Sequence, residues 1–157
     1  MPPQPLLDLS TIDLNKILVD KEGIRRANPQ RYEMEHLDGI VYIDTEHGRI
    51  VGIKNVRADE FWVRGHIPDR PILPGVIMIE AAAQLASYYT QTVLKYEGFF
   101  GFGGVDEVKF RGTVIPPARL VLVGQALDIR PRRSVCYLQG FVDDKMVFEG
   151  KITGMPV

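Results

Sequence analysis

A strongly apolar segment, residues 76–86, lies near the middle of the chain and contains a single charged side chain, Glu80. Alanine and long apolar side chains dominate the segment, and both favour a helix. Pro74 and Gly75 come directly before it and end an extended, proline-rich stretch. The pattern predicts one long helix from Gly75 to about Tyr96.

Segments rich in β-branched residues lie on both sides of this helix. Before it, Gly39–Asp44 and Gly48–Val56 predict two strands joined by the turn TEHG, and Phe61–Arg64 is a candidate extension of their pairing. After it, extended segments separated by Pro, Arg and Asp turns predict four successive antiparallel strands, at residues 102–114, 118–129, 134–142 and 146–153.

The segment 134–142 indicates how the sheet is covered. Apolar side chains occupy both parities of this segment, so both faces of the strand are expected to be covered. The helix from Gly75 is the one segment long and apolar enough to cover a face. These residues predict an α+β fold in which an antiparallel sheet wraps around one long central helix.

The chain is expected to form a single domain, residues 1–157, with a short amino-terminal arm over about residues 1–35. Its length of 157 residues and its hydrophobic content of 45% suffice for one compact core. Within the arm, Ser10 followed by Asp13 resembles a capping box. This pair predicts a helix through about Val19, with Gly23 as a later helix breaker.

Composition narrows the location and the partners of the protein. The chain has 19 basic and 20 acidic residues and so lacks the basic bias typical of nucleic-acid binders. Cys136 is the single cysteine, which favours a reducing compartment. The amino terminus has no signal-peptide pattern, and no segment forms an uninterrupted membrane span. A cytoplasmic protein that binds neither nucleic acid nor membrane is expected.

Polar residues follow one side of the predicted helix at positions i, i+4, i+7 and i+11, namely Glu80, Gln84, Ser87 and Gln91. A solvated helix face is one interpretation. However, the helix has no Lys or Arg before Lys95, whereas water-facing stripes usually carry several charges. A narrow cavity or an interface fits the stripe better.

His66 lies in the proline-rich loop before the helix, fourteen positions ahead of Glu80. One interpretation is a loop imidazole whose hydrogen bonds are satisfied by the backbone. In the other, His66 and Glu80 act together at the helix amino end, where free N–H groups stabilise developing negative charge. Gly75 would allow close approach, because it has no Cβ.

The segment GHIPDRPILPGVIMIEAAAQ, Gly65–Gln84, resembles the β-hydroxyacyl-acyl-carrier-protein dehydratases of the FabZ type. The resemblance continues at lower density from about Pro29 to Thr153. It implies the hot-dog fold and a homodimer in which each active site takes His from one subunit and the acid from the other. A trimer of such dimers is also implied.

The implied reaction removes water from a (3R)-3-hydroxyacyl thioester on acyl carrier protein and gives a trans-2-enoyl thioester. By resemblance, His66 is the catalytic base, Glu80 the catalytic acid, and the Gly75 amide polarises the thioester carbonyl. Val76 and Gln84 are expected to contact the substrate or its oxyanion. Gln84 either orients Glu80 or makes an ordinary polar contact. No cofactor is implied beyond the phosphopantetheine of the carrier.

The chain departs from the family pattern at three positions. The family commonly has His-Phe-Pro-Gly where this chain has Ile67 and Asp69 around Pro68, and Pro-His-Arg where it has Gln30. These changes leave His66 and Glu80 in place but affect acyl-site shape and carrier recognition. A hot-dog acyl thioesterase and a non-catalytic acyl-binding protein are the alternative functions.

Weaker signals complete the set of candidates. Five aromatic residues are candidate tunnel or gate residues, although core packing is the commoner role: Tyr88, Tyr89, Phe99, Phe100 and Phe102. Arg64 and Arg70 are candidate carrier contacts. The group His36, Asp44, Glu46 and His47 lacks a recognised ligand spacing, so no metal is predicted. The stretch GFFGFGG is interpreted as a turn or strand, not a phosphate loop.

Overall fold

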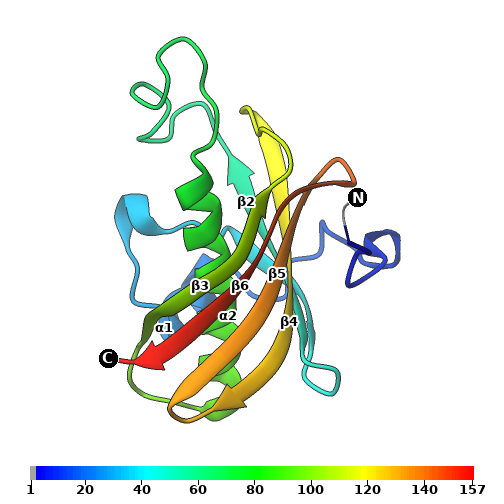
Figure 1. Ribbon diagram of the computed structural model, residues 1–157, viewed down its shortest axis with the longest axis vertical. Helices are drawn as coiled ribbons and strands as arrows, with labels where there is room; N and C mark the ends of the chain where they lie inside the picture. The colour runs from blue at the N-terminus through cyan, green and yellow to red at the C-terminus, as the bar shows by residue number, and fades with distance from the viewer. Residues whose placement is uncertain (1–2) are drawn as a thin grey trace.

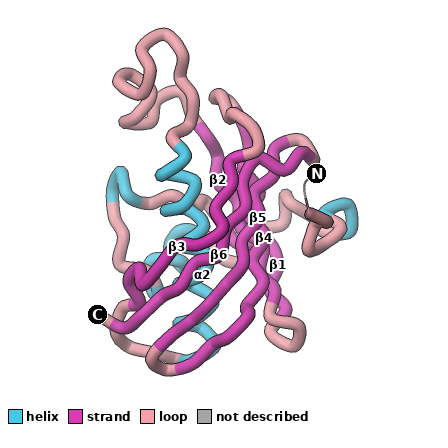
Figure 2. Tube along the Cα trace, in the orientation of Figure 1, coloured by secondary structure: helices cyan, strands magenta, loops and turns pink. Residues whose placement is uncertain are grey.

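The computed structural model describes residues 3–157 and is built from a six-stranded sheet and a long helix that lies against it (Figures 1 and 2). The strands are paired antiparallel in the order β1-β2-β4-β5-β6-β3. Along the chain the elements are the 3₁₀ turn Leu9–Thr11, α1 Lys21–Ala27, the 3₁₀ turn Tyr32–Met34, β1 Gly39–Asp44, β2 Arg49–Val56, α2 Gly75–Leu94, β3 Phe100–Phe110, β4 Ala118–Arg130, β5 Arg133–Val142 and β6 Lys145–Pro156.

The helix α2 begins at Gly75 as predicted and ends at Leu94, where Lys95 adopts a left-handed backbone with a φ of 52°. It packs against β2 to β6 and buries small side chains such as Ala81 completely. Gly52 of β2 permits this close approach, since a Cβ there would lie 2.8 Å from Leu85. No helix among residues 3–157 has the length and apolar character needed to cross a membrane.

Bulges bend the sheet around α2. β3 shifts register twice against β6, between Phe102 and Gly104 and between Asp106 and Lys109. The pairing of β4 with β5 shifts register once, at Leu127, between Ala126 and Asp128. Each bulge increases the local twist, and the curved sheet that results partly encloses the helix (Figure 1). The predicted α+β arrangement is confirmed.

The first part of the amino-terminal arm, residues 3–19, covers the other face of the sheet. Apolar side chains of the arm, Leu6, Leu7, Leu9, Ile12 and Leu14, pack on a second core cluster that includes Val51, Val123 and Phe141. Gln139 is fully buried and fastens the arm: its Oε1 accepts the Leu6 N–H at 2.8 Å, and its Nε2 donates to the Gln4 carbonyl at 3.0 Å. Both faces of the strand at 134–142 are therefore covered, as predicted.

The helix predicted from Ser10 to about Val19 is wrong. Asp8, outside the expected motif, accepts hydrogen bonds from the Ser10 N–H and hydroxyl and begins only a 3₁₀ turn. The helix of this region, α1, starts after Asp20, whose side chain accepts the Gly23 N–H at 2.9 Å. Gly23 thus lies inside a helix, where a Cβ would meet Val19 at 2.5 Å.

The strand extension expected at Phe61–Arg64 is also wrong. These residues form turns, in which the Val63 N–H donates to the Glu60 carbonyl and the His66 N–H donates to the Trp62 carbonyl. They belong to a loop, residues 57–74, that extends beyond the sheet at the amino end of α2 (Figure 1). We call it the His66 loop.

Candidate active site

The imidazole of His66 is held in one tautomer. Its Nδ1 lies 2.6 Å from the carbonyl oxygen of Ile72. A carbonyl can only accept a hydrogen bond, so Nδ1 carries the proton and Nε2 of the neutral ring is left with a free lone pair. The side chain is partly exposed. The backbone therefore satisfies one nitrogen of His66 and leaves the other available to take a proton.

The His66 loop is tied internally and to the body of the protein. The Arg70 N–H donates to the Ile67 carbonyl at 2.8 Å, and the Leu73 N–H donates to the Val114 carbonyl at 2.8 Å. Ile67 and Asp69, two of the departures from the family pattern, have positive φ angles of 58° and 67°. This left-handed region is uncommon for residues other than glycine, so the turn stores backbone strain beside His66.

The His66 loop leads directly into the amino end of α2, which has free backbone donors. Pro74 provides no capping side chain, and within residues 3–157 neither the Gly75 N–H nor the Val76 N–H finds a main-chain acceptor. Two uncapped N–H groups at a helix start can bind an oxygen on which negative charge develops. A Cβ on Gly75 would lie 2.8 Å from the Phe110 ring, so glycine keeps the helix start close to β3.

Glu80 is held by Gln84. The Gln84 Nε2 donates to the Glu80 Oε1 at 2.9 Å and to the Met34 carbonyl at 2.7 Å. The Gln84 Oε1 accepts the His36 N–H at 3.0 Å. These partners fix which end of the buried amide faces Glu80, so the carboxylate has a defined orientation. The contact favours the orienting interpretation of Gln84.

Glu80 and Gln84 line a cavity of about 140 Å³ between α2 and strands β3 and β6. Other lining residues include Gln30, Ser87, Phe99, Phe100, Phe102, Ser134 and Thr153. The polar side of α2 is therefore not a solvated face, because Gln84, Ser87 and Gln91 are all buried. Among the candidate aromatics, Phe99, Phe100 and Phe102 line the cavity, whereas Tyr88 and Tyr89 pack in the core.

The single chain does not bring His66 and Glu80 together. Within the described residues they share no hydrogen bond, and His66 is not part of the cavity that Glu80 lines. Gln30, which the sequence marks only as a departure, does line that cavity, and its buried Oε1 has no partner among these residues. His66, on the loop, thus lies apart from Glu80, which is held beside Gln84 at the cavity.

Three buried titratable side chains lie next to one another: Lys54, Glu60 and His36, whose main-chain N–H bonds to Gln84. The sequence pattern was not interpreted as predicting this group. Lys54 Nζ lies 2.6 Å from Glu60 Oε1 and 3.4 Å from His36 Nδ1. A signal was available: Lys54 has the same parity as the buried Ile50 and Val56 of β2, so it points into the core. This is an unusual place for a lysine.

The surroundings perturb two members of this group. Burial lowers the pKa of His36 to about 4, and the neighbouring Lys54 ammonium adds to this effect. Burial raises the pKa of Glu60, but hydrogen bonds from Lys54 and from the Arg57 N–H outweigh it and leave that pKa lowered. His36 is therefore neutral, and its Nδ1 can accept a hydrogen bond from Lys54.

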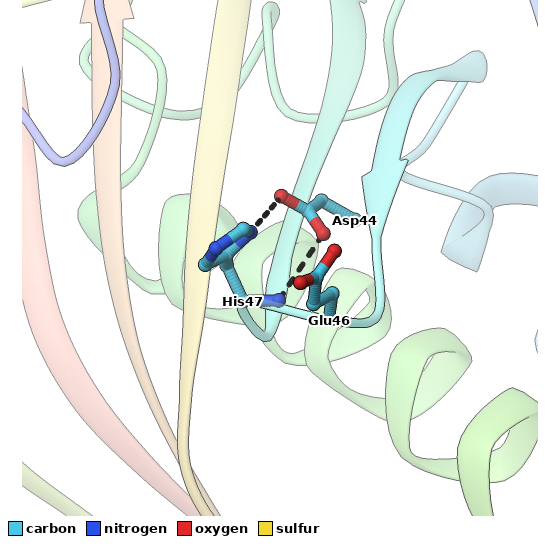
Figure 3. A group of neighbouring side chains, drawn as sticks. All are labelled: Asp44, Glu46 and His47. Carbon is cyan, nitrogen blue, oxygen red and sulfur yellow. Dashed lines mark hydrogen bonds and ion pairs between the residues drawn. The ribbon is translucent and has the colours of Figure 1, made fainter.

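The turn between β1 and β2 holds a group of possible metal ligands, Asp44, Glu46 and His47 (Figure 3). One potential ligand atom of each lies within 4.8 Å of the others. His47 already bonds to Asp44, with Nδ1 2.7 Å from Oδ2, and this hydrogen bond lowers the pKa of Asp44. Glu46 and His47 are exposed, and nothing here requires an ion. The absence of a resident metal stays a prediction.

Comparison with known proteins identifies the family of the chain. The model of the FabA-like domain family matches residues 28–151. A 3-hydroxyacyl-[acyl-carrier-protein] dehydratase FabZ of Thermoanaerobacter sp. strain X514 is 41% identical over 105 residues, which are 66% of this chain and 73% of that protein. The protein of the same name from Streptococcus pneumoniae serotype 4 is 34% identical over 137 residues, 87% of this chain and 96% of the other.

Among solved structures, the dehydratase heterocomplex ApeI:P from Xenorhabdus doucetiae superposes with a TM-score of 0.73, covering 85% of this chain and 90% of its own, at 14% sequence identity. Identity this low supports the fold alone. The family model goes further, since the residues that it matches include the whole segment Gly65–Gln84, and the two relatives are 34% and 41% identical. This chain belongs to the FabA-like domain family, as its resemblance to the FabZ type predicts.

Proposed function

We propose that this chain, acting as a single hot-dog domain, is a 3-hydroxyacyl-[acyl-carrier-protein] dehydratase. The observation that carries the proposal is that one chain holds both a histidine fixed with a free Nε2 and a carboxyl group oriented by a buried glutamine. The curated relatives bear the name of this activity. The substrate is a 3-hydroxyacyl thioester, and the products are a 2-enoyl thioester and water.

Each group has one role in the proposed mechanism. His66 Nε2 removes the proton from C2, next to the thioester carbonyl, while the free N–H groups at Gly75 and Val76 hold the carbonyl oxygen as negative charge develops. Glu80 acts as the general acid and gives a proton to the hydroxyl on C3. The C3–O bond breaks, the C2–C3 double bond forms, and water leaves. Gln84 keeps Glu80 oriented during the transfer.

A second copy of the chain completes the site in this proposal. His66 and Glu80 lie in separate parts of one chain, so His66 of one subunit is proposed to act with the partner's Glu80. The strand β3 supports such a dimer: it lies at the edge of the sheet, pairs with β6 alone among the described strands, and exposes Phe102 and Phe110 by half. A trimer of dimers is the expected larger assembly, to be measured by sedimentation.

The direct test is mass spectrometry of 3-hydroxyacyl and 2-enoyl carrier thioesters incubated with the protein. Loss and uptake of one water are expected from the two directions. His66→Ala and Glu80→Gln should each lower the rate by about 10²–10⁴-fold. His47→Ala, which alters an exposed histidine elsewhere, is the matched control. A free hydroxy acid would indicate a thioesterase, and binding without any product would indicate a non-catalytic acyl-binding protein.

Mixing the two inactive variants tests the shared site. In a mixed dimer one site receives both substitutions and the other receives neither. After dissociation and random reassociation, roughly a quarter of the wild-type activity should return, because half of the dimers contain one intact site. No recovery, with mixed dimers present by native mass spectrometry, would place His66 and Glu80 of one chain in the same site.

Two further expectations stay predictions. Arg64 and Arg70 are exposed on the His66 loop and are proposed to meet the acidic carrier protein. The cytoplasmic location rests on the single cysteine, and Cys136 is free and buried.

A further inference from the structure

A buried ion pair joins the His66 loop to the sheet. Lys54 of β2 and Glu60 of the loop lie 2.6 Å apart, with side-chain exposures of 3% and 7%. The second oxygen of Glu60 accepts the Arg57 N–H at 2.9 Å. One carboxylate thus binds the lysine on the sheet and the backbone at the start of the loop.

Stability alone does not explain this pair. Removing two charges from water costs several kcal/mol for each ion, and apolar residues of similar size often replace a buried pair with no loss of stability. The position of the pair suggests another role. The Glu60 carbonyl accepts the Val63 N–H at 3.1 Å, and the Trp62 carbonyl accepts the His66 N–H at 2.8 Å. Glu60 therefore anchors the turns that lead to His66.

Lys54 is also linked, through His36, to the residues that hold Glu80. Its Nζ lies 3.4 Å from Nδ1 of His36, which is 1% exposed. The main-chain N–H of His36 donates to Gln84 Oε1, and Gln84 donates to Glu80. Lys54 thus stands between the segment that orients Glu80 and the loop that carries His66.

We propose that Lys54, through its ion pair with Glu60, is a positioning residue that fixes the His66 loop on the sheet of its own chain, and so sets where His66 meets the partner's Glu80. The inference rests on the proposed function of His66 and Glu80. A displacement of about 1 Å in a catalytic group can cost about 10²-fold in rate. Loss of the pair should therefore lower kcat and leave substrate binding nearly unchanged, because neither residue touches the cavity.

The test compares Lys54→Met with the double variant Lys54→Met/Glu60→Met. The single variant should be unstable, because it leaves Glu60 buried without a partner. The double variant should regain a melting temperature close to wild type, yet keep a kcat at least about ten-fold lower with KM within about two-fold. Hydrogen exchange in residues 57–74 should be faster than in wild type. Arg130→Met, which breaks an exposed ion pair with Asp128, should change none of these quantities.

The outcomes separate the inference from the proposed function. Full recovery of kcat together with the melting temperature, and unchanged exchange in the loop, would mean that the pair is only structural and would overturn the inference. If the double variant fails to fold, Glu60→Gln tests the inference in its place. The glutamine keeps an oxygen that can accept from Lys54 but loses the oxygen that accepts the Arg57 N–H. An unchanged kcat and loop exchange in Glu60→Gln would equally overturn the inference. If wild type dehydrates no substrate, the proposed function fails, and the exchange comparison still decides whether Lys54 anchors the loop.

Discussion

His36 makes the stability of this protein depend on pH in a way that one substitution removes. Its imidazole is 1% exposed, and burial with the nearby Lys54 ammonium lowers its pKa from 6.5 to about 4. Between these values the unfolded chain binds a proton that the folded chain excludes. Stability is therefore complete above pH 6.5 and is lost progressively as the pH falls towards 4.

The magnitude follows from the two pKa values. Their difference, at about 1.4 kcal/mol for each pKa unit, amounts to about 3 kcal/mol of unfolding free energy. Such a loss is a large fraction of the stability of a typical domain, about 5–15 kcal/mol. The lowered pKa of Glu60 adds a further loss as the pH falls through its folded value. That contribution is present whether or not residue 36 titrates.

The assay compares wild type with His36→Gln by urea unfolding at several pH values and a fixed protein concentration. Glutamine does not titrate, and its amide oxygen can still accept from Lys54. Trp62 is the single tryptophan and is 4% exposed, so its fluorescence reports loss of the core. From about pH 7.5 to about pH 4, wild type should lose about 3 kcal/mol more than His36→Gln.

Parallel pH dependence in the two proteins would refute this reasoning. So would an NMR titration in which the His36 ring gains its proton near 6.5 in the folded protein. A smaller difference of the predicted sign would mean that the folded chain relaxes to admit water beside Lys54.

Packing, backbone strain and the amino-terminal arm give three further tests. Gly52→Ala should lower the free energy of unfolding by about 1–3 kcal/mol, because the added Cβ would lie 2.8 Å from the buried Leu85. Gly65→Ala is the control, because a Cβ at Gly65 would have nothing within 4 Å. Equal effects of the two substitutions would contradict the packing argument. The φ angle of Asp69 is 67°, which glycine adopts easily and valine does not. In thermal unfolding, Asp69→Gly should therefore be at least as stable as wild type, and Asp69→Val about 1–2 kcal/mol less stable. The reverse order would rule out backbone strain at this position. Gln139→Leu should release the arm to limited proteolysis, and equal cleavage rates would mean that apolar packing alone holds it.

Local pattern was sufficient for the central elements. The helix α2 follows from an apolar run that starts directly after a proline and a glycine, and β1 and β2 follow from β-branched segments around a short turn. In each case the signal lies within a few residues of the element it specifies. The resemblance then located His66, Gly75 and Glu80 and implied the fold that the structure has.

Local pattern failed where other contacts compete for the residues of a predicted element. Ser10 is a residue type common at helix caps, but its N–H and hydroxyl donate hydrogen bonds to Asp8. The apolar side chains that follow pack on the outer face of the sheet. Phe61–Arg64 reads as a strand, yet the buried Glu60 next to it binds Lys54 and bends the chain into turns. These partners are near in sequence, but the packing of the arm on the sheet and the burial of the Lys54–Glu60 pair depend on the tertiary structure, which a short window of sequence does not show.

The sequence by itself determined which chemical groups the protein has and how far apart they lie along the chain, including the glycine that opens the helix. Only the tertiary structure decided their state. The Ile72 carbonyl selects the tautomer of His66, and the Met34 carbonyl and His36 N–H, 50 and 48 positions away, fix the amide of Gln84. The structure also keeps His66 apart from Glu80 within one chain. Hydrogen bonds and burial of this kind depend on which distant segments the packed core brings together, and spacing along the sequence does not specify that.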